Sequence, residues 1–80
     1  MSDREDLITK EQCKAARGLL NWSQKELADK VRIRAATIGD FERGATTPIK
    51  KNLEDIKLAF EEFGIRLENN KKELVVRLLK

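Results

Sequence analysis

Residues 22–44 read WSQKELADKVRIRAATIGDFERG and contain two short helical patterns, one directly after the other. Ser23 and Glu26 form a capping box at the start of the first pattern, because each side chain can accept a backbone N–H of the first turn. The second pattern spaces its apolar residues for a helix and stops at Gly44, which suits the left-handed conformation that ends many helices. Two short helices separated by about three residues, over 23–43, have the dimensions of a helix-turn-helix.

The flanking sequence predicts one helix before this pair and one after it. Thr9 and Gln12 form another capping box, which places the start of the first helix. Gly64 ends the last helical pattern. The apolar faces of the four predicted helices are Cys13, Ala16 and Leu20; Leu27, Ala28 and Val31; Ile38 and Phe41; and Leu53, Ile56, Ala59, Phe60 and Phe63.

The last segment, residues 65–80, has a different period. Its first residues alternate apolar and charged side chains, and 69–72 have the composition of a turn. The run 74–79 fits a strand face and a helix stripe equally well, but its adjacent valines and the preceding strand and turn favour a β-hairpin. We therefore expect a flexible N-terminus over 1–8, a helical domain over 9–64 and a hairpin over 65–80.

Composition excludes several functions. The 80 residues include no His and a single Cys, Cys13, so one chain offers neither a zinc site, nor a disulfide, nor an imidazole-based catalytic relay. The acidic pairs Glu54/Asp55 and Glu61/Glu62 point in different directions on a helix and indicate a solvated face. No apolar run is long enough to cross a membrane. We expect an intracellular protein that is not an enzyme and needs no metal or cofactor.

The net charge of +3 is unevenly distributed. Residues 1–23 and 52–80 are each balanced, whereas residues 24–51 carry seven basic and four acidic side chains. The surplus therefore falls within the helix-turn-helix and the loop that follows it. This pattern predicts a neutral scaffold with one basic face, where the backbone of DNA could lie.

Residues 12–64 resemble the Cro/XRE-type DNA-binding domains, the family of lambda repressor. The resemblance rests on W-S-Q-x-E-L-A at 22–28, on A-T-I-x-x-F-E-R-G at 36–44 and on Thr47-Pro48. It implies a compact lambda-repressor-like bundle, mostly α, in which the usual fifth helix is replaced here by the hairpin. It also implies a small cytoplasmic transcriptional regulator, typically a repressor, of prokaryotic or phage origin that binds double-stranded DNA.

The resemblance assigns roles to individual residues. Gln24 matches a phosphate-contacting glutamine, and Arg17 and Glu42 match an ion pair that ties the first helix to the third. Arg34 is the strongest candidate for a guanine or phosphate contact, while Asp40 would repel phosphate unless it accepts from a cytosine amine. The expected DNA-binding residues are Ser23, Gln24, Lys25, Arg34, Ala35, Ala36, Gly39, Asp40, Arg43, Thr46, Lys50 and Lys51.

Two residues depart from the family pattern. Arg32 stands in the turn where members usually have Gly, and a left-handed conformation there would cost roughly 1 kcal/mol. Arg34 stands where members usually have a Ser or Thr cap, whose loss costs a similar amount, roughly 1 kcal/mol. Both changes add a cation beside the presumed groove.

Two questions stay open at the level of sequence. The run 74–79 has apolar residues on both faces, so the hairpin could pair with a second copy in a dimer, or could simply pack on Leu67 and the last helix. The domain could also serve as a protein-interaction module, such as an antitoxin-like partner binder, because Ala35 and Ala36 offer no hydrogen bonds to bases.

Overall fold

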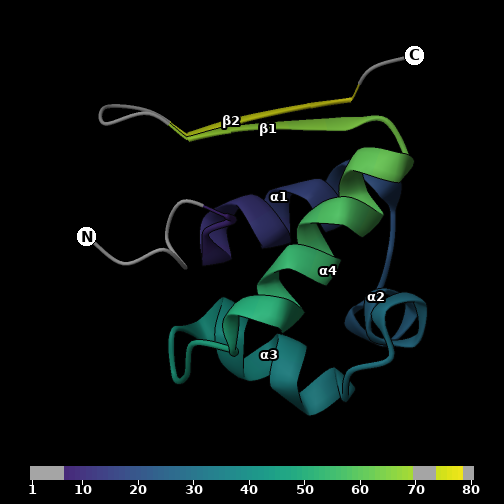
Figure 1. Ribbon diagram of the computed structural model, residues 1–80. Coiled ribbons are helices and arrows are strands. Elements are labelled where there is room, and N and C mark those ends of the chain that lie inside the picture. The colour runs from purple at the N-terminus through teal and green to yellow at the C-terminus, as the bar shows by residue number, and fades with distance from the viewer. Residues whose placement is uncertain (1–6, 70–73, 79–80) are drawn as a thin grey trace.

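A computed structural model describes residues 7–69 and 74–78 of the chain. Within this part, four helices are followed by two strands (Figure 1). They are α1 (Lys10–Leu20), α2 (Gln24–Val31), α3 (Ala35–Arg43), α4 (Lys50–Glu62), β1 (Ile65–Asn69) and β2 (Leu74–Leu78). The predicted fold class, a mostly helical bundle with a C-terminal hairpin, is confirmed. None of the described helices is long and apolar enough to span a bilayer.

Local hydrogen bonds set the helix boundaries. Both predicted capping boxes are present, with Thr9 and Gln12 at the start of α1 and Ser23 and Glu26 at the start of α2. At the other end of α1, Asn21 takes the left-handed conformation with φ 59°, and its N–H reaches back to carbonyls of the last turn. Each capping box satisfies backbone donors that a helix start would otherwise leave without partners.

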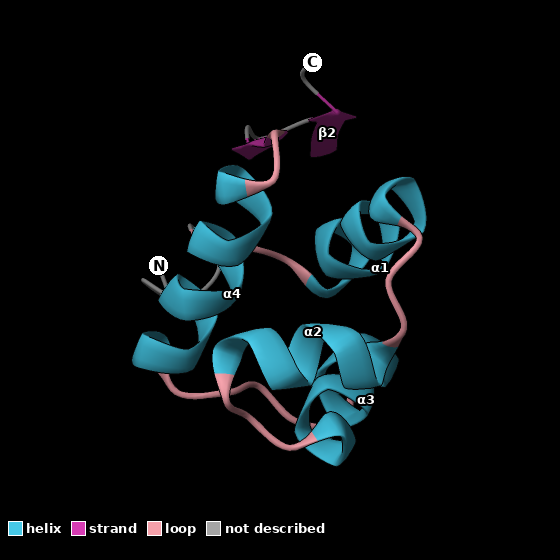
Figure 2. Cartoon of the chain, turned by 90° about the vertical axis from the view of Figure 1, so that its right-hand side faces the viewer, coloured by secondary structure: helices cyan, strands magenta, loops and turns pink. Residues whose placement is uncertain are grey.

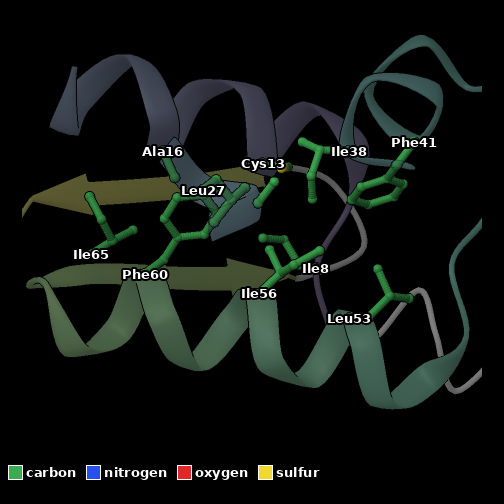
Figure 3. Packing of buried hydrophobic residues seen from close by; sticks show 11 residues of the cluster. Ile8, Cys13, Ala16, Leu27, Ile38, Phe41, Leu53, Ile56, Phe60 and Ile65 are labelled. Atoms are coloured by element: carbon green, nitrogen blue, oxygen red, sulfur yellow. The ribbon is translucent and has the colours of Figure 1, made fainter. Parts of the chain in front are cut away.

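The core lies between α1 and α4 and is closed by α2 and α3 (Figure 3). All four predicted apolar faces contribute to it, and its largest buried side chains come from Phe60, Leu27, Ile38, Leu53 and Ile56. Ile8 corrects the predicted N-terminal boundary, because its side chain is only 1% exposed and packs in this core. Burying an isoleucine is worth about 1.5–3 kcal/mol, which holds residue 8 against the bundle. Leu7 is half-buried and also packs against this core, whereas residues 1–6 of the predicted flexible segment lie outside the described residues.

The C-terminal strands form an antiparallel hairpin in which Leu67 faces Val76 in the register. Ile65 is 2% exposed and Leu67 packs against the core, so β1 covers the bundle. β2 lies along α1 (Figure 1). The choice between strand and helix is thereby settled as strand for 74–78, while 70–73 and 79–80 of the predicted hairpin lie outside the described residues.

The two ends of the molecule carry different elements. Figure 2 shows α2 and α3 together at one end and the strands at the opposite end, with α1 and α4 between them. The helix-turn-helix is therefore free of the hairpin, and its outer surface is shaped by α2, α3 and the loop that leads into α4.

Candidate nucleic-acid interface

The first turn of α2 carries Gln24 at the helix-turn-helix end of the molecule. The Ser23 capping box fixes the start of this helix, which makes Gln24 its first residue. The Gln24 side chain is half-buried, and its Nε2 donates to Oε1 of Glu42 in α3 over 3.1 Å. The amide expected to contact phosphate is therefore positioned by the neighbouring helix.

An ion pair joins α1 to α3, as expected for Arg17 and Glu42. Nε of Arg17 donates to Oε2 of Glu42 over 2.7 Å, and Nη2 donates to Oε1 over 2.6 Å, a bidentate geometry. The side chains are 17% and 2% exposed, respectively. Nη1 of Arg17 also donates to the backbone carbonyl of Trp22 over 2.8 Å. One guanidinium thus connects α1, the start of the helix-turn-helix and α3.

Cys13 also contacts the carboxylate of Glu42, and the sequence did not predict this contact. Its thiol donates to Oε2 of Glu42 over 3.2 Å from within the core. Burial and then the hydrogen bond to Glu42 raise the pKa of the Cys13 thiol far above its ordinary value, so it is a neutral donor. The only sign in the sequence was that Cys13 lies one helical turn before Arg17.

The protonation of the pair follows from these contacts. Burial alone would raise the pKa of Glu42, but hydrogen bonds from Arg17, Gln24 and Cys13 outweigh it and leave that pKa below its ordinary value. The hydrogen bond to Glu42 is also the main reason that the pKa of Arg17 is raised. The pair is therefore charged at neutral pH, and Glu42 adds little to the field outside the molecule.

α3 has one buried and one exposed side. Ile38 and Phe41 point into the core, as predicted, and are 0% and 6% exposed. Arg34 is the N-cap without a side-chain capping bond, and it is exposed together with Ala36 and Arg43. Ala35, Thr37 and Asp40 are half-buried. The exposed side is the one on which base contacts were expected.

Gly39, one of the expected DNA-binding residues, is buried on α3. A Cβ at this position would lie 3.1 Å from Oε1 of Gln24 and 3.2 Å from Nη1 of Arg43. Because Gly39 has no side chain, the Gln24 amide can lie against α3 here and reach Glu42. Gly39 therefore leaves room for the side chains of Gln24 and Arg43 on this surface. Helix periodicity alone could not reveal this role.

Several of the expected basic contacts are engaged within the protein. Arg43 pairs with Asp40 one turn earlier on α3. Lys25 pairs with Asp29 over 3.1 Å, and Lys51 pairs with Asp55 over 2.9 Å. These are exposed i,i+3 or i,i+4 pairs of the kind worth about 0–1 kcal/mol, which a phosphate can displace. Thr46 is exposed in the loop, and Lys50 is the exposed first residue of α4.

The turn of the helix-turn-helix contains a left-handed residue, Arg32, at the position where the sequence predicted a conformational cost. Arg32 ends α2 with φ 58° and ψ 44°, which is the left-handed region. Its N–H donates to the carbonyl of Ala28, and the side chain is exposed. The backbone therefore makes the tight turn that Gly makes at lower cost, and a guanidinium is left on the surface.

Two short helices, the second with an outward face beside the first turn of the other, define a helix-turn-helix DNA-binding domain. The helix-turn-helix family model matches residues 14–68, and the chain belongs to the Cro/C1-type, or XRE, helix-turn-helix family. It is accordingly a DNA-binding helix-turn-helix regulator. No curated protein matches the chain.

Proposed function

We propose that this regulator binds duplex DNA by placing α3, residues 35–43, in the major groove. An α-helix with its side chains is about 10–12 Å across, which matches the width of that groove. In this proposal Gln24, Arg43, Lys50 and Lys51 bind backbone phosphates on either side of the groove. Ser23 and Lys25 flank Gln24, and Thr46 lies in the loop before α4.

The observation that carries the proposal is the connection of Gln24 to α3. Its Nε2 is bound to Glu42, which is itself held by Arg17, so the first turn of α2 has a fixed position beside α3. The first-turn N–H groups and the positive end of the α2 dipole favour a phosphate at this point. A groove-binding helix and a phosphate anchor in fixed register are what a DNA-reading unit needs.

The side chains on α3 predict a modest dependence on base sequence. Ala35 and Ala36 can contact thymine methyl groups but cannot form bidentate bonds to bases. Asp40 is already paired with Arg43, which reduces its repulsion of phosphate. Arg34, exposed at the start of α3, is the side chain suited to guanine. We expect DNA shape to contribute to site selection at positions without a base contact.

We further propose that the protein acts as a dimer joined through the hairpin. Within the described residues the sheet has two strands, so each strand keeps one edge without a strand partner. The strands and α3 lie at opposite ends of the molecule (Figure 2). Face-to-face stacking of two hairpins would turn the α3 helices away from each other. Edge-to-edge pairing about a two-fold axis keeps both on one side, able to read half-sites one helical turn apart.

Selection of bound sequences from random duplexes tests the function, because it reports binding, sequence and half-site spacing together. We expect a recovered motif and an affinity that falls steeply with salt and drops on Arg34→Ala and Lys50→Ala. Lys57→Ala in α4 serves as the control, since it removes the same charge away from α3. Sedimentation should give twice the mass of one chain. A purely monomeric protein would contradict the dimer.

The alternative function is a protein-interaction module with little DNA readout. No detectable duplex binding by the wild-type chain at low salt would favour that module and refute the regulator. Neither reading includes catalysis, a metal or a cofactor.

A further inference from the structure

A hollow lies between α1 and the C-terminal end of α3, next to the surface assigned above to DNA. Its lining comes mainly from long charged side chains of two helices. The lining residues are Lys10, Glu11, Lys14, Ala15, Glu42 and Arg43. The hollow adjoins the α3 surface, because Arg43 belongs to both.

Lys10 lies at the end of α3, where the absence of a side chain at Gly44 leaves room for its ammonium group. A Cβ at Gly44 would lie only 2.7 Å from Nζ of Lys10, so the ammonium rests against the point where α3 ends. Lys10, Lys14 and Arg17 follow one another at i, i+4 and i+7, which puts them on one side of α1. That side faces α3, since Arg17 is bound to Glu42 there.

The charges around the hollow do not cancel. Glu42 is already taken by Arg17, so this pair contributes no net charge. Lys10 and Lys14 are both exposed, and neither forms an ion pair with a residue in the described part of the chain. Arg43 also lines the hollow, but its charge is balanced by Asp40. The two ammonium groups therefore face the single further carboxylate of Glu11. Like charges gathered in this way repel one another and favour an anion between them.

We propose that Lys10 and Lys14, together with Arg43, bind a phosphate of the DNA backbone next to the C-terminal end of α3. This inference rests on the proposed function, because the phosphate belongs to the same duplex that α3 enters. The continuity of the hollow with the exposed side of α3 favours DNA over a separate acidic partner. The backbone contacts of the domain then extend onto α1, whose segment of the sequence is neutral overall.

The salt dependence of duplex binding tests this inference. The probe is a fluorescent mixed-sequence duplex of about two helical turns, and its affinity is measured by anisotropy over a range of salt concentrations. Each phosphate contact contributes roughly 0.9 to the slope of log K against log salt. Lys10→Ala and Lys14→Ala should each make this slope shallower, by up to about 0.9. Lys57→Ala should keep the wild-type slope. Glu11→Gln should bind more tightly than wild type, because it removes the opposing charge.

The outcomes separate this inference from the function on which it rests. If the wild-type chain binds the duplex but Lys10→Ala and Lys14→Ala keep its slope, the α1 contact is wrong and the α3 proposal stands. If the wild-type chain fails to bind any duplex, both are overturned. Circular dichroism melts of each variant show whether the domain remains folded, and we expect little change because Lys10, Glu11 and Lys14 are exposed.

Discussion

Replacing Glu42 by Gln tests how far the bundle depends on its buried carboxylate. The amide keeps the shape of the side chain but loses the charge, and it presents an N–H₂ group where the carboxylate accepted hydrogen bonds. One of its surrounding donors, from Arg17, Gln24 or Cys13, then faces another donor. Arg17 is left without its counter-charge.

The size of the effect follows from the exposure of the two partners. Removing one partner of a buried ion pair costs about 3–5 kcal/mol. The Arg17 side chain is 17% exposed, so water can recover part of its hydration, and we expect the lower end, about 3 kcal/mol. For a domain of this size, 1 kcal/mol corresponds to roughly 4–8 °C in Tm, so the variant should melt about 12–24 °C lower.

The pH dependence gives the prediction a second signature. The pKa of Glu42 lies below its ordinary value in the folded protein, so its stabilising effect is complete above the unfolded pKa of about 4.3. It is lost as the pH falls through the folded pKa. The difference in unfolding free energy between wild type and Glu42→Gln should therefore be constant near neutrality and should narrow in acid.

Thermal and urea unfolding, followed by circular dichroism at neutral pH and at about pH 3, measure both effects. Glu54→Gln is the matched control, because Glu54 is an exposed acid on α4 and its replacement should change stability by less than about 0.5 kcal/mol. Equal melting of Glu42→Gln and the control at neutral pH would refute the reasoning. So would a gap that keeps its full size in acid.

Three further tests, two substitutions and one labelling experiment, probe the turn, the surface of α3 and the core. Arg32→Gly should raise stability by about 1 kcal/mol in urea unfolding, because Arg32 has φ 58°; an unchanged midpoint would mean that the left-handed residue is not strained. Gly39→Ala should stabilise α3 by about 0.5–1 kcal/mol yet weaken duplex binding in anisotropy, since its Cβ displaces the ends of Gln24 and Arg43; unchanged affinity would argue against the positioning of Gln24. Cys13, which is 0% exposed and has a raised pKa, should react with a thiol reagent only as fast as the protein unfolds, and fast labelling of the native protein would contradict its burial.

Local signals in the sequence predicted the helical framework well. The capping boxes at Thr9 and Ser23 depend on residues three positions apart, so they can be read without knowing the fold. Gly44 likewise ends α3 in the left-handed conformation, with φ 79°. The ion pair of Arg17 and Glu42 was available only through the family resemblance, because the two residues are far apart in the chain.

Features that depend on contacts between helices could not be predicted. Gly39 lies on the outward side by periodicity, but it is covered by the side chain of Gln24 from α2 together with that of Arg43. Ile8 precedes the first cap and carries no periodic signal, yet it fills the core. Lys10 and Lys14 occupy a segment whose charges balance, so a count along the sequence hides their approach to α3. Charge sums describe surfaces only where neighbours in sequence are also neighbours in space.

The packing of β2 along α1 has a consequence for how the molecule is made. The two elements are separated by about 55 residues, and closing a loop of that length costs roughly 3–4 kcal/mol of chain entropy before any contact repays it. During synthesis on a ribosome, α1 emerges first, and it has no strand packed against it while the other three helices follow. Its strand-facing side is covered only when residues 74–78 leave the exit tunnel, so the helix-turn-helix can assemble before the fold is closed.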